Sequence, residues 1–170
     1  MDGSSVWTGN EKGVLQQTLV ASTGGGDETL TGSSIRETTL QGTFQARLAT
    51  SRIRIRIRSR RTDVKGDNTS IADRTGAAYV SMDSSAGAGN AHNGTLKGSP
   101  TALVYGRAIR AASTASAVAL VHDFSWEFIA PDAGSHTYTF CLAGGTANTV
   151  TVYSNSDTVR ATMEITEEEP

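Results

Sequence analysis

Cysteine, proline and aromatic residues are all scarce in this chain of 170 residues. The single cysteine, Cys141, excludes an intramolecular disulfide framework and a zinc site built from several cysteines. It lies in an expected strand, where we favour a small buried side chain over a catalytic nucleophile. Aromatic residues make up 6% of the chain, so the core has to be built largely from aliphatic side chains.

Long apolar runs are missing as well. No stretch approaches the roughly 18 apolar residues of a membrane-spanning helix. The N-terminus also lacks the basic and apolar regions of a secretory signal. We therefore expect a soluble chain that makes no membrane contact. The net charge of −2 argues against a general nucleic-acid binder.

Motifs for catalysis and cofactor binding are also absent. The chain has neither the Gly-x-Ser-x-Gly elbow of a serine hydrolase nor a Gly-x-x-x-x-Gly-Lys phosphate loop. Its three histidines, His92, His122 and His136, show no metal-ligand spacing. In a strand, His122 and Asp123 would point to opposite faces, and we expect His136 to satisfy a turn beside Gly134. We accordingly expect no enzyme activity, no cofactor and no metal.

The most distinctive feature that is present is the stretch 51–61, in which isoleucine alternates with arginine. Side chains alternate with period two in a strand, so this pattern predicts a strand with one apolar face and one cationic face. A helix would scatter the isoleucines around its circumference. The arginine face supplies our candidate interaction residues, which are Arg52, Arg54, Arg56, Arg58 and Arg60.

Several interpretations of this arginine row stay open. The row could bind a polyanion, such as nucleic acid, an anionic glycan or the acidic surface of a capsid shell, with strong salt dependence. It could also meet acidic groups of a neighbouring subunit, for which the C-terminal glutamates are candidates. We favour an ordinary solvated face with cross-strand pairs to Asp or Glu. No aromatic residues interleave with the arginines, which weakens a single-stranded nucleic-acid interpretation.

Period-two patterns elsewhere predict about eight strands and no confident helix. The pattern of 42–48 changes phase before Ile53, which requires a turn or bulge near 49–51. A short strand follows at 77–82, then a long loop at 83–100, a central strand at 101–111 and an ambiguous segment at 108–119. The segment 118–129 alternates its aromatic residues, which we assign to the core or to a subunit interface. The remaining strands lie at 136–142, 150–152 and 159–165, which we interpret as a three-stranded antiparallel meander. The fold class is therefore all-β: an antiparallel β-sandwich or jelly roll with an extended N-terminal arm.

We expect two parts in the chain. Residues 1–40 are polar and rich in Gly, Ser and Thr, so they would have difficulty offsetting their own ordering entropy. We interpret them as an arm for attachment or contact between subunits, with Trp7 as its natural anchor. Residues 41–170 form the sandwich domain.

A family resemblance rests on the run from Ala130 to Phe140, Ala-Pro-Asp-Ala-Gly-Ser-His-Thr-Tyr-Thr-Phe, and on the closing Thr-Met-Glu-Ile at 162–165. This part resembles the C-terminal half of jelly-roll domains in bacteriophage virion proteins, such as capsid decoration proteins and tail-fibre tips. Those domains are similar in topology to trimeric tumour-necrosis-factor and complement-C1q heads. The resemblance covers roughly the last fifty residues well and the segment from Gly42 loosely, by strand order alone. It does not cover the arm. It implies a homotrimer in the virion, with a major capsid protein or a tail component as its partner.

The sequence therefore leads to a non-enzymatic phage structural protein, most simply a trimeric capsid decoration or cement protein that stabilises the shell. A tail-fibre or receptor-binding tip that recognises host surface glycans is the first alternative. Another polyanion-binding β-sandwich module is the second.

Overall fold

The structure is a computed structural model that describes residues 6–7, 14–21, 28–66, 73–74, 76–102, 106–107, 118–144, 148–152 and 161–170. No helix occurs among these residues. The strands, in chain order, are β1 (Val6–Trp7), β2 (Val14–Ala21), β3 (Glu28–Thr31), β4 (Arg36–Gln45), β5 (Arg52–Gly66), β6 (Asp73–Arg74), β7 (Gly76–Met82), β8 (Thr95–Ala102), β9 (Gly106–Arg107), β10 (Val118–Ile129), β11 (Ser135–Gly144), β12 (Asn148–Val152) and β13 (Thr162–Glu168).

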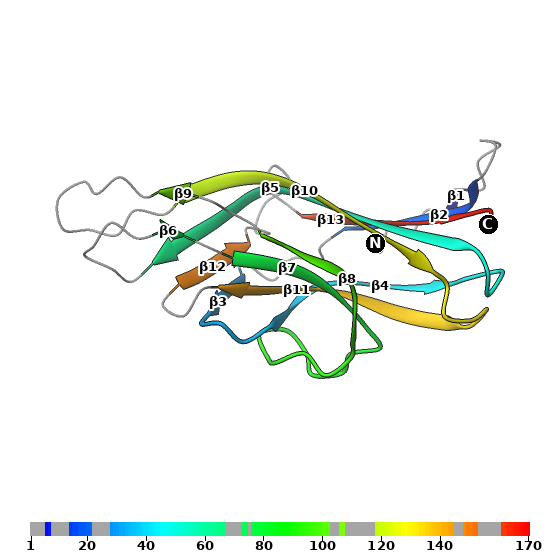
Figure 1. Cartoon of the computed structure of the whole chain (residues 1–170), viewed down its shortest axis with the longest axis horizontal. Coiled ribbons are helices and arrows are strands. Elements are labelled where there is room, and N and C mark those ends of the chain that lie inside the picture. The colour runs from blue at the N-terminus through cyan, green and yellow to red at the C-terminus, as the bar shows by residue number, and fades with distance from the viewer. Residues whose placement is uncertain are drawn as a thin grey trace.

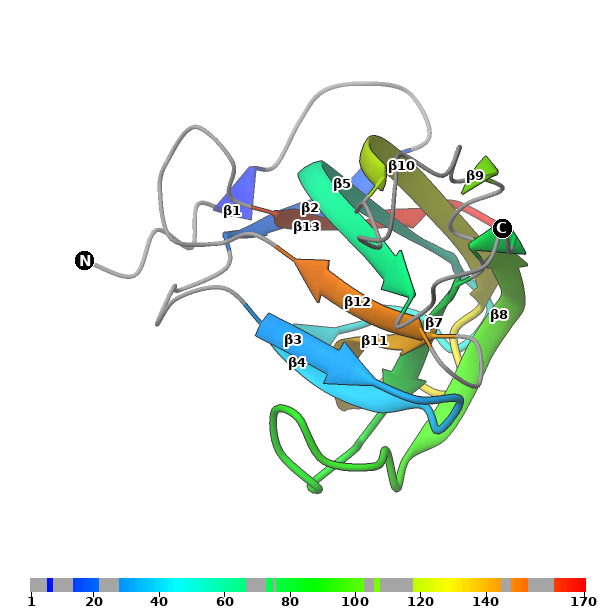
Figure 2. The same ribbon diagram turned by 90° about the vertical axis from the view of Figure 1, so that its left-hand side faces the viewer.

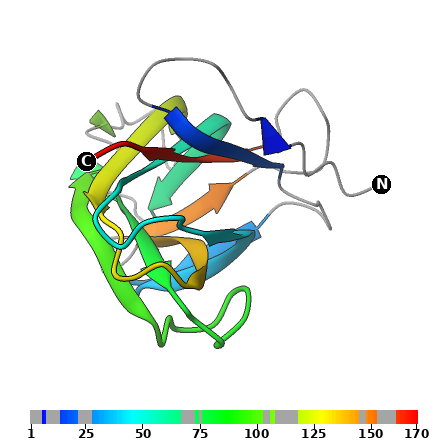
Figure 3. The same ribbon diagram turned by 90° about the vertical axis from the view of Figure 1, so that its right-hand side faces the viewer.

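Two antiparallel sheets lie face to face, with their strands running along the long axis of the molecule (Figure 1). The larger sheet has the order β1-β2-β13-β5-β12-β3, and β10 also pairs with β5. The smaller sheet has the order β4-β11-β7-β8. Figures 2 and 3 look along the long axis from its two ends and show β2 and β13 in one layer and β4, β7 and β11 in the other. The short strands β6 and β9 pair only with each other in the described structure.

Eight of these strands define the architecture: β2, β4, β5, β7, β8, β10, β11 and β13. Numbered one to eight in chain order, they run first–eighth–third–sixth in the larger sheet and second–seventh–fourth–fifth in the smaller one. In this order each sheet receives strands from both halves of the chain, which is the double Greek key of a jelly roll. The expected all-β jelly-roll sandwich is thus confirmed.

The long strand β5 organises the larger sheet. Its first half pairs with β13 and its second half with β12, while β10 runs along nearly its whole length on the opposite edge. The isoleucines Ile53, Ile55 and Ile57 are fully buried, and the arginines between them point outward and are half-buried. The two faces predicted from the alternation are confirmed.

The core lies between the sheets and is completed by aromatic side chains. Phe124 and Trp126 of β10 and Phe140 of β11 form one cluster, with ring centroids 5.9–6.5 Å apart. Phe128 and Tyr138 form a second contact at 5.7 Å. The aromatic stripe expected to enter the core does so, because both strands present alternate side chains to the gap between the sheets.

The expected boundary at residue 40 falls inside a strand. Strand β4 begins at Arg36, and Glu37, Thr38 and Leu40 are buried. Upstream, β2 pairs with β13 along its whole length, and β3 pairs with β12. Low apolar content misled the prediction, because a strand at a sheet edge gains its hydrogen bonds from a neighbour and needs few core side chains.

The expected C-terminal meander is also wrong. Strand β11 belongs to the smaller sheet between β4 and β7, whereas β12 and β13 belong to the larger one. The connection after β11 therefore passes from one sheet to the other. Alternation along the chain identifies a strand but does not identify its hydrogen-bonding neighbour.

The remaining predictions concerned the middle of the chain and the turn before β5. The loop after β7 is shorter than expected, since β8 begins at Thr95, and β8 is the edge strand of its sheet where we expected a central strand. Leu48, the last residue of the expected strand at 42–48, is exposed just before the turn, whereas Phe44 and Ala46 are buried. The turn itself lies at 49–50, as the change of phase predicted. The expectation for 108–119 falls almost wholly outside the described residues.

Candidate interaction surface

The arginine row lies on the outer face of the larger sheet, flanked by acidic strands. Strand β10 places Asp123 and Glu127 on this face, because these residues alternate with the buried aromatic side chains. Strand β13 places Glu168 on the other flank. Cations on the central strand therefore stand between two rows of carboxylates, at the distances that antiparallel cross-strand neighbours adopt.

Arg54 contacts both flanking strands. Its Nε donates to Glu127 Oε1 at 2.8 Å, and its Nη1 lies 2.8 Å from Glu168 Oε1. One guanidinium thus links three adjacent strands. The exposed fractions of these side chains are 41% for Arg54, 46% for Glu127 and 19% for Glu168, so solvent screens the pairs considerably.

Arg56 and Arg58 share one carboxylate. The Arg56 Nε donates to Asp123 Oδ1 at 2.8 Å, and its Nη2 also donates to Asp123 Oδ2. The Nε of Arg58 is 3.7 Å from the same Oδ2. Hydrogen bonding from Arg56 lowers the pKa of Asp123, and the same bond raises the pKa of Arg56. The acidic partners are on the same chain, as the cross-strand interpretation requires.

The other sequence-predicted site residues are located less completely. Arg52 is exposed and lies across from Ile129 and Glu168. Arg60 belongs to β5, and Trp7 belongs to β1, where it pairs with Gln17. The side chains of Arg60 and Trp7 lie outside the described structure.

One of the C-terminal glutamates is not available to a partner. Glu167 is fully buried and stabilises the turn before β5. Its Oε1 accepts the backbone N–H of Arg47 at 2.8 Å, that of Leu48 at 3.2 Å and the hydroxyl of Ser51 at 2.6 Å. An open hollow of about 370 Å³ lies beside this turn, lined by Gln45, Ala46, Arg47 and Ala133.

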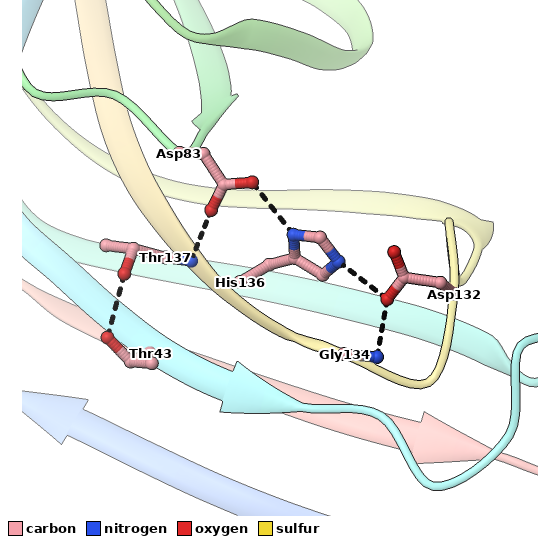
Figure 4. A network of polar contacts seen from close by, with 6 residues as sticks. All are labelled: Thr43, Asp83, Asp132, Gly134, His136 and Thr137. Carbon is pink, nitrogen blue, oxygen red and sulfur yellow. Dashed lines mark hydrogen bonds and ion pairs between the residues drawn. The ribbon is translucent and has the colours of Figure 1, made fainter.

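A second polar network centres on His136 at the start of β11 (Figure 4). Its Nδ1 lies 2.8 Å from Asp83 Oδ2, and its Nε2 lies 3.0 Å from Asp132 Oδ1. Asp83 Oδ1 accepts the backbone N–H of Thr137 at 3.0 Å, and Asp132 accepts that of Gly134. The expectation that His136 satisfies a turn is confirmed, although sequence alone did not indicate Asp83, 53 residues away.

Buried polar side chains gather on the outer face of the smaller sheet. Glu37, Ser81 and Thr139 are each at least 97% buried, and each has one side-chain oxygen without a hydrogen-bond partner. The loop after β7 covers Glu37, whose Oε2 accepts the N–H of Gly87 at 2.8 Å. Cys141 lies opposite Glu37, and burial raises the pKa of its thiol to about 12. Such a thiol is an inert core residue at neutral pH.

The described residues include no group of three or more His, Cys, Asp or Glu side chains arranged to hold a metal ion. Within the same residues there is no helix long and apolar enough to cross a membrane.

Comparisons with known proteins give distant structural similarities. No protein-family profile and no curated protein sequence matches the chain. The VP2 subviral particle of infectious bursal disease virus is similar at 10% identity and a TM-score of 0.38, over 90% of this chain and 37% of that one. A lipoprotein of Bacteroides thetaiotaomicron is similar at 11% identity and a TM-score of 0.36, over 100% of this chain and 94% of that one. A Clostridium thermocellum xylanase 10B fragment, with CBM22-1 and GH10 modules, is similar at 12% identity and a TM-score of 0.33, over 99% of this chain and 25% of that one. This chain spans little more than a third of the VP2 chain, and the jelly-roll assignment therefore rests on its own strand order.

Proposed function

We propose that this chain is a non-enzymatic structural protein of a bacteriophage virion, where three copies assemble as a capsid decoration or cement protein. The observation that carries this proposal is the strand order of the two sheets, because it extends the likeness seen at 130–140 and 162–165 to the whole sandwich. Its partners would be further copies of itself and the major capsid protein.

The polar side chains support a role without catalysis. In a Ser-His-Asp hydrolase one histidine nitrogen must be free to take a proton from the serine. In His136 both ring nitrogens contact carboxylates. The thiol of Cys141 and the hydroxyl of Ser81 are both fully buried.

The ion pairs of the arginine row make polyanion binding the weaker alternative. Arg54, Arg56 and Arg58 already contact carboxylates of their own chain. A polyanion would have to displace these carboxylates and would meet their repulsion.

The tail-fibre alternative has less support for a different reason. The exposed loop at 83–94 consists mainly of small residues, which are held by contacts within the loop and with β4.

The test is assembly with particles of the virus whose genome carries this sequence. Sedimentation equilibrium at micromolar concentration should give three times the chain mass of 17.8 kDa. Adding the protein to shells that lack it should raise the temperature at which the shells rupture. A stable monomer that leaves shell rupture unchanged would contradict the proposal.

A further inference from the structure

The side chain of His136 can form both of its hydrogen bonds in only one of its protonation states. Ionised carboxylates accept hydrogen bonds and cannot donate them, whereas a neutral imidazole has a single N–H. Asp83 and Asp132 approach the two different ring nitrogens at 2.8 and 3.0 Å. Both contacts are hydrogen bonds at once only when the ring carries two protons, as imidazolium. The His136 side chain is 14% exposed, whereas those of Asp83 and Asp132 are 50% and 61% exposed, so the ring is largely shielded from water while its two partners stay partly solvated.

The ring connects two reversals of the chain. Asp83 directly follows β7 and starts the loop that leads to β8, with a left-handed φ of 56° that is unusual for a residue other than glycine. Its backbone N–H also donates to the carbonyl of Thr137 at 2.7 Å. Asp132 belongs to the turn between β10 and β11 (Figure 4). One imidazolium therefore fastens a loop and a turn that are distant in sequence to the same strand.

Two other titratable groups lie near this network, Lys97 and Tyr138. Lys97 of β8 attracts Asp83, and Tyr138 of β11 packs beside the ring with a centroid distance of 6.5 Å. Across β4 the neighbour of His136 is Phe44, which does not titrate. Hydrogen bonding to Asp83, followed by Asp132, raises the pKa of His136. The contacts with His136 lower the pKa of both carboxyls in return.

We propose that His136 is a pH-operated latch that fastens the loop starting at Asp83 and the turn at Asp132, and that opens as the imidazolium loses a proton. The latch is complete below the ordinary histidine pKa of 6.5 and is lost as the pH rises through the raised pKa of the folded protein. On the acid side it holds until the pH falls through the lowered pKa values of the two carboxyls, below 3.8.

Opening the latch affects the first part of the loop more than its far end. A neutral ring leaves one carboxylate facing a nitrogen lone pair, which repels it. The far end keeps the backbone hydrogen bonds that Gly89 and Asn90 exchange with Glu37, at 2.6 and 3.0 Å. Ser84 and Ser85 keep their own hydrogen bonds to Asn93. Opening therefore releases the links of Asp83 and Asp132 to His136 as the pH rises above the raised pKa, while the sandwich stays folded.

The direct test is nitrogen NMR of the full chain labelled with 15N-histidine. At pH 6 both ring nitrogens of His136 should carry a proton, and the titration midpoint should lie above 6.5. Asp132→Asn should lower this midpoint while leaving Asp83 in contact with the ring. A single neutral tautomer at pH 6, or a midpoint at or below 6.5, would overturn the proposal.

A second measurement follows stability against pH. The urea midpoint of the native chain should fall between pH 6 and 9, and His136→Gln should flatten this fall, because glutamine carries no titrating group. His92→Gln is the matched control and should keep the dependence on pH. An unchanged slope in His136→Gln would overturn the proposal, and the NMR titration on the unmodified chain decides the question if that variant does not fold.

Discussion

At the scale of single residues, the two faces of β5 contribute to stability in different ways. The isoleucines have no exposed surface, whereas the side chains of the arginines between them are 41% exposed and paired with exposed carboxylates. Burial of an isoleucine contributes roughly 1.5–3 kcal/mol. An exposed ion pair contributes about 0–1 kcal/mol. The apolar face should therefore dominate the free energy of unfolding.

Replacing Ile55 with Thr should lower the free energy of unfolding by about 1.5–3 kcal/mol, because it removes buried apolar surface and adds a hydroxyl. Replacing Arg56 with Thr on the same strand is the matched control and should cost no more than about 1 kcal/mol. Urea denaturation of both variants measures the difference. Equal losses would show that the assignment of the faces is wrong.

Gly98 of β8 makes room for the Trp126 side chain. A Cβ at this position would lie 1.7 Å from Trp126 Cδ1, and the φ of 74° is itself unfavourable for other residues. Gly98→Ala should therefore displace the indole and destabilise the fold, measured by the near-ultraviolet circular dichroism of tryptophan and by urea denaturation. Gly89→Ala is a suitable control, because it has a similar φ of 78° but nothing within 4 Å of its Cβ position. Similar losses in both variants would show that backbone strain, and not contact with the indole, sets the cost.

Some of these residue-scale features could be predicted from sequence and others could not. The alternation around Ile55 predicted both faces of β5. Asp123 and Glu127 alternate with aromatic residues, so their sequence pattern alone indicates an acidic outer face suited to arginine partners. The pairing of Asp83 with His136 had no local signal, because it depends on how β7 and β11 come together in space.

At the scale of elements, the N-terminal strands belong to the sandwich. Strand β2 covers the outer edge of β13, which carries the buried residues Met163 and Ile165. The composition of residues 1–40 gave no information about this pairing. The three-stranded meander failed for a related reason: alternation shows which face is buried, whereas the neighbour of each strand is decided by the packing of the whole chain.

Removing residues 1–27 tests the role of β2. The deletion exposes the hydrogen-bonding edge of β13. We therefore expect a lower urea midpoint and a greater tendency to aggregate. Size-exclusion chromatography and urea denaturation give the readouts. A truncated chain with unchanged stability would restore the interpretation of this segment as an independent arm.

At the scale of the whole molecule, the jelly roll presents one face on which both signs of charge are already paired. Replacing Arg54, Arg56 and Arg58 together with Thr leaves the carboxylates of β10 and β13 without their cations. If this face also contacts another subunit or the shell, assembly should weaken and lose part of its salt sensitivity, because screened attractions have been removed. Sedimentation across a range of salt concentrations measures this. Unchanged assembly at every salt concentration would show that the paired face is only solvated.

Imaging of the purified particles at a resolution that shows strands is the decisive test of the proposal that this jelly roll is a structural component of a virion. We expect clusters of three sandwiches on the shell, each with the β2-β13-β5-β10 and β4-β11-β7-β8 sheets. Particles whose resolved surface and tail contain no density for this fold, and whose protein content lacks this chain, would contradict it.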